Sequence, residues 1–336
     1  MERIKLPLAP GLEVQFADRE QALKKVEEWA DRGMSVVQVV HGPEGCGKTA
    51  WLRQSAVLLR ELGFHVIYVD PLRKYFEAYT DVKEVVRRLA EAAAETLGEA
   101  KIKLASLVID AAVELIKRRR RKVAILVDDV FQAIGLGEAA SYVKAVLGII
   151  EYPPASYERV IAVVATSEGF TRREIGRHRW AALLTMWNMP RDGFRQLYDQ
   201  MPGGKPLFED VWRITGGNPK LLGRLYEARW SADEIVDELI KARGLVGFVE
   251  SLGGGDRELL AKALDEPDAL VSREGKPLLD KLVALNLVVD DVYPRSRGLW
   301  VDEPPPERDP ELGIGKYVAW QTPLHREAVR RALESA

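Results

Sequence analysis

The amino-acid sequence predicts an α/β fold in which helices sandwich a parallel sheet, followed by two smaller parts. Short runs of apolar, mostly β-branched residues indicate strands that are buried on both faces, as in parallel sheets. The predicted strands cover residues 36–40, 65–70, 123–127, 160–165 and 183–186. Apolar residues at helical spacing predict helices at 81–97 and 101–117, which would cover the sheet. Strands that alternate with helices along a chain are typical of this fold class.

The composition changes after Pro190, where predicted helices follow one another without an intervening strand. We therefore predict an α/β core at residues 1–190 and a helical lid subdomain at 191–245. Residues 246–336 show helices followed by two strands, at 286–290 and 316–320, which is the order of a winged helix. The acidic, proline-rich segment 302–310 is expected to be exposed or mobile.

Capping residues predict where several helices begin. A Ser, Thr, Asn or Asp side chain before a helix can accept a hydrogen bond from its first turn. Proline is favoured at the first helical position, and Gln three residues after the cap completes a capping box. Such starts are predicted at Asp18 with Gln21, Asn218 with Pro219, Ser272, and Thr322 with Pro323.

Residues 42–49 fit the pattern G-x-x-x-x-G-K-[ST] between a predicted strand and a predicted helix. In such a phosphate loop, glycines let backbone N–H groups face phosphate oxygens, and the helix adds the positive end of its dipole. Lys48 can reach the β- and γ-phosphates, and the Thr49 hydroxyl can bind Mg²⁺. A chance Gly-rich turn is the alternative, which the context disfavours. The predicted nucleotide-binding residues are Gly42, Pro43, Glu44, Gly45, Cys46, Gly47, Lys48, Thr49 and Ala50.

Two carboxylates end the strand predicted at 123–127. Parallel sheets bind ligands at the carboxyl ends of their strands. Asp128 would therefore hold Mg²⁺ through water, and Asp129 would orient or deprotonate the attacking water. A turn that contains two aspartates is the structural alternative. Thr166 and Ser167 follow the next strand, where a polar side chain could contact the γ-phosphate or the water.

Two clusters of cations have both a functional and a structural interpretation. The arginines of the stretch 171–180 could stabilise transition-state charge, but for each of them we favour an ordinary surface charge. The basic run 117–122 could bind nucleic acid or an acidic partner. We favour a solvated helix end, whose cations complement the helix dipole.

The bulk composition excludes several classes of protein. The 336 residues include 49 Lys and Arg against 51 Asp and Glu, so no global field attracts nucleic acid. The single cysteine, Cys46, rules out an internal disulfide, and we interpret it as a packing residue. The four histidines lack metal-ligand spacing. No apolar run reaches membrane-spanning length and no signal peptide is evident, so we expect a cytoplasmic protein without a membrane partner.

In this order, the motifs resemble those of archaeal P-loop ATPases of the STAND class, relatives of the AAA+ and origin-recognition ATPases. The resemblance includes an N-terminal box at 16–20 and the segment 215–219. It implies an adenine flanked by Phe16, Asp18, Arg19 and Pro219. It also implies a first sensor at Thr166 or Ser167 and an arginine finger at Arg172 or Arg173.

The sequence departs from the family pattern at two places. Asp129 replaces the glutamate that is common in fast AAA+ hydrolases, which implies slow turnover. The helical subdomain lacks an unmistakable sensor arginine, for which Arg224 is a candidate.

The predicted function is a nucleotide-driven switch. ATP or ADP with Mg²⁺ would bind between the sheet and the lid, and hydrolysis would reposition the winged helix, which acts on double-stranded DNA or on a protein. The cations of this part that favour DNA binding are Arg273, Lys276, Lys281, Arg295 and Arg297. The acids that oppose it are Glu274, Asp280, Asp290 and Asp291. A homo-oligomer is compatible with this function. The alternatives are a P-loop kinase, with Asp70 as acceptor base, or a nucleotide-stabilised scaffold.

Overall fold

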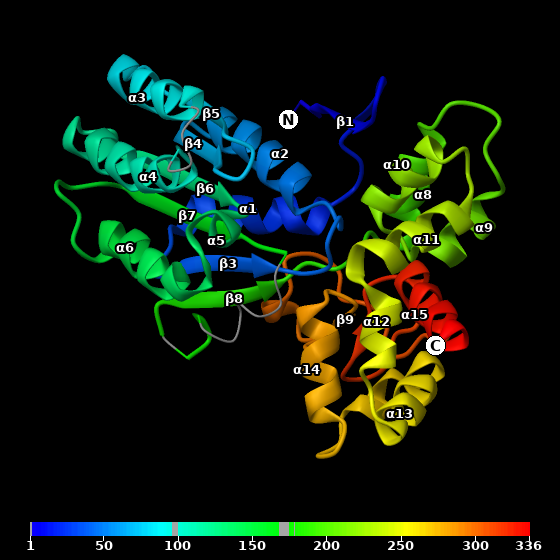
Figure 1. Cartoon of the computed structure of the whole chain (residues 1–336). Helices are drawn as coiled ribbons and strands as arrows, with labels where there is room; N and C mark the ends of the chain where they lie inside the picture. Colours follow the sequence, from blue (N-terminus) through cyan, green and yellow to red (C-terminus); the bar gives the residue numbers. More distant parts are fainter. Residues whose placement is uncertain (1, 96–99, 168–174, 178) are drawn as a thin grey trace. The chain divides into compact units, whose positions relative to one another are not determined.

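The computed structural model describes residues 2–95, 100–167, 175–177 and 179–336. The chain forms two compact units (Figure 1). The first unit contains Met1–Arg3, Arg19–His41 and Lys48–Thr185. The second unit contains Ile4–Asp18, Gly42–Gly47 and Met186–Ala336. The chain therefore passes into the second unit and back within the phosphate loop.

The first unit is built on a sheet with the strand order β5-β4-β6-β7-β3-β8 (Figure 1). All neighbouring strands are parallel except β5, which pairs with β4 in the antiparallel sense. The bounds are β3 Val37–His41, β4 His65–Asp70, β5 Tyr75–Tyr79, β6 Lys122–Asp128, β7 Arg159–Ala165 and β8 Ala181–Thr185. The five predicted strands are confirmed, with ends shifted by at most two residues. The antiparallel edge strand β5 was not predicted.

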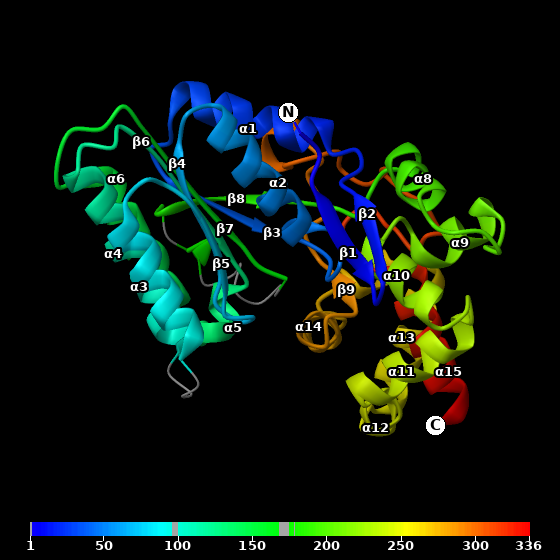
Figure 2. The same cartoon turned by 90° about the horizontal axis from the view of Figure 1, so that it is seen from above.

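Helices cover both faces of this sheet, with α1 and α2 on one face and α4 and α6 on the other (Figure 2). The bounds are α1 Glu20–Arg32, α2 Lys48–Glu61, α3 Lys83–Ala94, α4 Ala100–Lys117, α5 Val130–Ile134 and α6 Ala139–Glu151. Val123, Ile125 and Val127 of β6 share a core with α4 and α6. The alternate residues of β6 point to the opposite face, so a strand that is apolar throughout requires helices on both sides.

The predicted capping box of Asp18 and Gln21 at the start of α1 remains a prediction. The residue before the helix is Arg19, in the left-handed conformation with φ 64°, and its own side chain does not cap the helix. Asp18 also has a positive φ, of 56°. A capping residue typically has extended backbone dihedrals, whereas this turn has left-handed ones.

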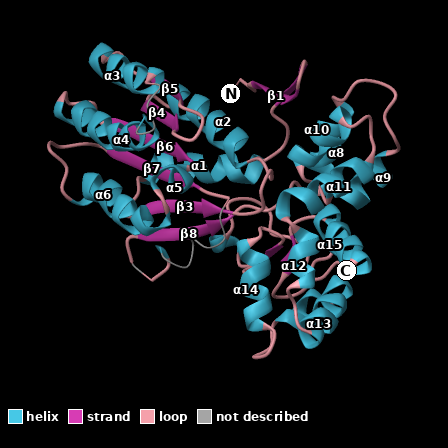
Figure 3. Ribbon diagram, viewed as in Figure 1, coloured by secondary structure: helices cyan, strands magenta, loops and turns pink. Residues whose placement is uncertain are grey.

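The second unit is mainly helical, as Figure 3 shows. It begins with a hairpin of β1 (Lys5–Ala9) and β2 (Leu12–Gln15) that the sequence analysis missed. The helices are α8 Arg191–Asp199, α9 Phe208–Thr215, α10 Pro219–Glu227, α11 Ala232–Arg243, α12 Leu245–Glu250, α13 Gly254–Asp265, α14 Lys276–Ala284 and α15 Pro323–Ser335. One hydrophobic core joins Val14 of the hairpin to Leu222, Leu260 and Val329. The predicted division at residue 245 remains a prediction.

Two predicted helix starts in this unit are confirmed. The Asn218 side chain accepts from the Leu221 N–H, and Pro219 is the first residue of α10. Thr322 caps α15 in the same way, with Pro323 next. Ser272 does not cap α14, because its hydroxyl accepts from the Gly275 N–H at 2.9 Å and closes the turn before the helix.

The C-terminal strands and the loop between them are partly as predicted. β9 (Val288–Val289) and β10 (Ala319–Trp320) form the expected antiparallel pair. Within the acidic segment 302–310, Asp302 and Pro305 are buried, so the segment is less exposed than predicted. The Arg295 guanidinium holds part of it by donating to the carbonyls of Pro305 and Pro306, each at 3.0 Å.

Candidate active site

The carboxyl ends of β6, β7 and β3 lie next to one another in the first unit. Asp128 is paired with Ala165 in the β6–β7 register. The Asp129 N–H donates to the Ala165 carbonyl at 3.0 Å, and the Thr166 N–H donates to the Val40 carbonyl at 2.9 Å. These bonds gather the ends of three strands at one edge of the sheet.

Asp128 is almost completely buried at this edge, with 1% of its surface exposed. Its Oδ2 accepts from the Tyr68 hydroxyl at 3.2 Å, while its Oδ1 has no hydrogen-bond partner in the described part of the chain. Burial raises the pKa of Asp128 to about 7, and the charges of Asp129 and Asp70 add to this effect. The Thr49 hydroxyl and the Lys48 ammonium act in the opposite direction. Lys48 and Thr49, the first residues of α2, therefore lie close to Asp128.

Asp129, the residue that precedes α5, is the second carboxylate at this edge of the sheet. Its backbone is left-handed, with φ 44°. Burial raises the pKa of Asp129, as does Asp70, whereas Lys48, Arg73 and the Ser167 N–H lower it. Its Oδ1 is buried and has no hydrogen-bond partner among the described residues. The site therefore holds two adjacent carboxylates with unused oxygen atoms.

These groups fit a magnesium ion. Mg²⁺ prefers oxygen ligands and is usually held by one or two carboxylates together with phosphate oxygens and water. The unpartnered Asp128 Oδ1 and the neighbouring Thr49 hydroxyl are such oxygens. Asp128 and Thr49 are thus the residues that would hold the ion.

We expect Asp128→Asn to stabilise the nucleotide-free protein at pH 8. Because the folded-state pKa lies above the unfolded value, the folded chain binds more protons between about pH 4 and pH 7. Wild-type stability therefore falls as pH rises through this window, by roughly 2–4 kcal/mol for a shift of this size. Urea unfolding without divalent cations measures the difference, which should be large at pH 8 and small at pH 5.

The control for this experiment is Asp110→Asn, an exposed acid of α4 that pairs with Arg88 at 3.3 Å. It should show little pH-dependent difference from the wild type. Equal effects of both substitutions at pH 8 would contradict the assignment of a destabilising buried charge to Asp128.

The loop residues 42–47 belong to the second unit, where there is no room for side chains at two glycines. A Cβ on Gly42 would lie 1.9 Å from the Met186 carbonyl oxygen. A Cβ on Gly45, which has φ +77°, would lie 2.4 Å from the Lys220 Cβ. Cys46 is fully buried, and its thiol lies 3.6 Å from the Met186 carbonyl oxygen. This position agrees with the interpretation of Cys46 as a packing residue.

The other predicted site residues lie in different elements of the two units. Pro219 precedes Lys220, whose N–H donates to the Gly45 carbonyl at 3.3 Å, so the start of α10 lies at the loop. Phe16 is buried in the second unit and Arg19 in the first. Asp18 packs against Gly193 of α8, where a Cβ would lie 1.9 Å from the Asp18 Oδ2. Ala50 is half-buried in α2. Arg172 and Arg173 lie outside the described residues, as do residues 96 and 97 of the helix predicted at 81–97.

Asp70, the proposed acceptor base of a kinase, is already engaged. Its Oδ1 accepts from the Arg73 N–H at 3.0 Å, and its Oδ2 accepts from the Arg73 guanidinium at 2.5 Å. Asp70 is also buried, with 1% exposed. A buried carboxylate whose two oxygens both accept hydrogen bonds is poorly placed to accept a proton from a second substrate. Arg224 is similarly engaged, with Glu227 and Glu238.

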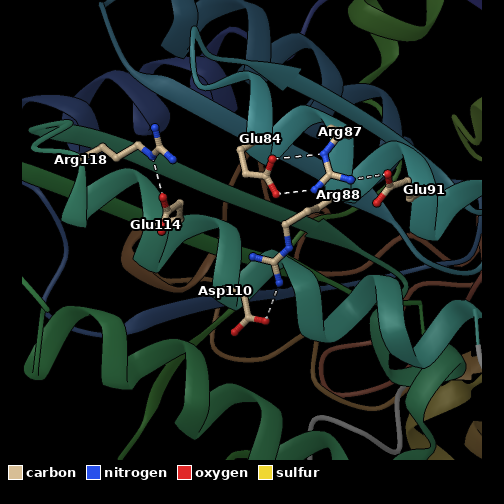
Figure 4. Close-up of polar contacts among 7 residues, drawn as sticks. All are labelled: Glu84, Arg87, Arg88, Glu91, Asp110, Glu114 and Arg118. Carbon is tan, nitrogen blue, oxygen red and sulfur yellow. Dashed lines mark hydrogen bonds and ion pairs between the residues drawn. The ribbon is translucent and has the colours of Figure 1, made fainter.

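The charges at the ends of α3 and α4 are neutralised locally. Arg87 bridges Glu84 and Glu91 along α3, and Arg88 links α3 to Asp110 of α4 (Figure 4). In the basic run, Arg118 pairs with Glu114 at 2.6 Å and Arg120 pairs with Asp81 at 2.6 Å. These pairs favour a solvated helix end over a nucleic-acid surface.

Sequence reasoning missed two side chains beside the carboxylates. Tyr68 is the one aromatic residue in the strand His65–Asp70, and a hydroxyl in a buried strand needs a partner. That need is a usable signal for a contact such as the one with Asp128. Arg73 offered no comparable signal, because its contact with Asp70 depends on the turn between β4 and β5.

A strand, a phosphate loop and a helix beside an acid-terminated parallel strand define the class of P-loop nucleotide-binding proteins. Residues 16–225 match the family model described as "ATPase domain predominantly from Archaea", and the chain belongs to this family. No curated protein matches the sequence. No helix within the described residues is both long and apolar enough to cross a membrane.

Several solved structures resemble most or nearly all of the chain weakly. The ADP form of the ORC2 protein of Aeropyrum pernix is 13% identical, with a TM-score of 0.42, over 94% of this chain and 93% of that one. The DNA complex of the ORC1 protein of Aeropyrum pernix is 17% identical, with a TM-score of 0.38, over 95% and 92%. AMPPCP-bound DnaA from Aquifex aeolicus is 13% identical, with a TM-score of 0.38, over 78% and 75%. Similarity at this level carries no functional argument.

Proposed function

We propose that the chain binds ATP at residues 42–49 and hydrolyses it slowly to ADP and phosphate. The observation that carries this proposal is the gathering of Lys48, Thr49, Asp128 and Asp129 at one edge of the sheet. Such a set has the charges and hydrogen-bonding groups that a triphosphate and its metal ion require. Membership of an archaeal ATPase-domain family agrees with it.

Each residue has a chemical role in this proposal. The loop amides and the N-terminus of α2 bind phosphate oxygens, and Lys48 neutralises charge on the β- and γ-phosphates. Asp128 and Thr49 would hold a magnesium ion, which would further neutralise the phosphates. Asp129 orients the attacking water and accepts its proton, to which its raised pKa is suited. Thr166 or Ser167 would contact the γ-phosphate or the water.

We further propose that the nucleotide state alters the position of the C-terminal part of the chain. Residues 42–47 bond to α10 through Asn218 and Lys220, which supports coupling between nucleotide binding and the second unit. A ligand shifts a conformational equilibrium only if it binds the two states differently. ATP and ADP differ at the γ-phosphate, next to this loop.

The C-terminal part would act on a protein rather than on DNA. Arg295, one of the cations predicted to contact DNA, also donates to the carbonyls of Gly315 and Lys316, so its guanidinium makes four hydrogen bonds to backbone oxygens. Lys276 pairs with Asp280 at 3.1 Å. Engaged cations among many acids make a poor surface for phosphates.

We accordingly expect no salt-sensitive binding to double-stranded DNA. The measurement is fluorescence anisotropy of a labelled duplex, titrated with the full chain at 50 mM and 200 mM salt. Phosphate contacts would lower affinity steeply between these concentrations. Tight binding at 50 mM salt that is lost at 200 mM would identify DNA as the partner instead.

An ATPase assay of the full chain tests the proposed function. Phosphate release is measured at several protein concentrations, with and without duplex DNA. A rate per chain that rises with protein concentration would indicate a homo-oligomer that completes the site with a residue from a neighbour. Stimulation by DNA would again favour DNA as the partner.

A further inference from the structure

Glu44, the third residue of the phosphate loop, uses all its polar atoms in contacts with residues distant in sequence. Its N–H donates to the Gln321 Oε1 at 3.0 Å, and its carbonyl accepts from the Asn218 side chain at 2.9 Å. Its Oε1 accepts from the Lys220 ammonium at 2.6 Å, and its Oε2 accepts from the Arg243 guanidinium at 2.7 Å. Residues 42–47 and all four partners belong to the second unit.

The surrounding structure holds these partners in place. Asn218 is fixed because it caps α10 through the Leu221 N–H and also donates to the Asn188 side chain at 2.9 Å. Lys220 follows in the first turn of α10, and its Cβ occupies the space next to Gly45. Arg243 ends α11. The carboxylate of Glu44 therefore joins two separate helices to the loop.

Glu44 is ionised at neutral pH. Burial alone would raise the pKa of this carboxyl, but the hydrogen bonds and positive charges of Lys220 and Arg243 outweigh burial and hold it at about 2. His325 lies nearby and is buried; burial and the charge of Arg243 lower its pKa to about 4, so it is neutral at pH 7. One negative and two positive charges therefore leave a net charge of +1 beside the loop.

We propose that Glu44 is a positioning residue that ties the phosphate loop to α10 and α11 and limits how strongly Lys220 and Arg243 attract a nucleotide. This inference rests on the proposed binding of ATP at the same loop. A carboxylate beside a triphosphate is unfavourable unless cations neutralise it. Lys220 and Arg243 provide that neutralisation, so the cations and the carboxylate should affect ATP binding in opposite directions.

The experiment compares ATP dissociation constants, measured by calorimetry, for substitutions that keep the shape of each side chain approximately. Glu44→Gln changes the local charge from +1 to +2 and should tighten ATP binding by about threefold to tenfold, the effect of one partly screened charge at about 10 Å. Arg243→Gln changes it from +1 to 0 and should weaken binding by a similar factor. The double variant Glu44→Gln with Arg243→Gln should return close to the wild-type affinity.

Two further variants separate charge from structure. Glu44→Asp keeps the charge but shortens the side chain, so it should lose one of the two cation contacts and weaken binding. Glu266→Gln, at an exposed glutamate of the second unit, removes the same overall charge far along the chain and should leave ATP affinity unchanged. Circular dichroism of each variant serves to check that it is folded.

The outcomes distinguish this inference from the proposed function. If Glu44→Gln and Arg243→Gln both weaken binding and their effects add in the double variant, Glu44 is only a packing residue and the inference is wrong. If Lys48→Ala binds ATP as the wild type does, the proposed function itself fails, whatever Glu44→Gln does. Rescue of Arg243→Gln by Glu44→Gln supports the inference, because a purely structural role cannot produce it.

Discussion

Lys48→Ala should weaken ATP binding at least about 100-fold, or about 2.7 kcal/mol. Lys48 begins α2, is 4% exposed, and lies close enough to Asp128 and Asp129 to lower the pKa of both. Its removal leaves the triphosphate without its main neutralising charge and removes the cation that acts on both carboxylates. Calorimetric titration with ATP and Mg²⁺ measures the effect.

The matched control for Lys48→Ala is Lys24→Ala, an exposed lysine of α1 in the same unit. That substitution should leave ATP affinity unchanged. An ATP affinity of Lys48→Ala within a factor of about two of the wild type would show that ATP does not bind at this loop.

Asp129→Asn should separate binding from hydrolysis. The substitution keeps the size of the side chain but removes its capacity to accept a proton. A positioned general base contributes about 10²–10⁴-fold to a rate, so hydrolysis should slow at least about 100-fold. ATP affinity should be unchanged or slightly higher, because a negative charge near the phosphates is lost.

A single-turnover assay with excess enzyme measures this step without interference from product release. Asp31→Asn, an exposed acid at the end of α1, serves as the control and should retain the wild-type rate. If Asp129→Asn hydrolyses bound ATP at the wild-type rate, another residue activates the water.

Much of the first unit was predictable because its information is local in sequence. Apolar runs identify β4 and β6, and the order of a strand, residues 42–49 and a helix identifies the phosphate loop. Because strand ends of a parallel sheet share one edge, the proximity of Asp128 to Thr49 also followed. The structure agrees with this proximity.

Other features were not predictable because they depend on distant residues or on backbone conformation. Asp18 and Arg19 form a left-handed turn, with φ values of 56° and 64°, that no local pattern in the sequence indicates. The four contacts of Glu44 join residues that are 174 to 277 positions apart, and no local pattern encodes them.

The hairpin of β1 and β2, by contrast, was missed although it had a local signal, since Pro10 and Gly11 form a turn dipeptide.

Phosphate release by the purified full chain, supplied with ATP and Mg²⁺ and no other substrate, tests the central claim most directly. The account predicts slow, repeated release of one phosphate for each ADP formed, reduced at least about 100-fold by Asp129→Asn. Release no faster from the wild type than from the Asp129→Asn variant would contradict it.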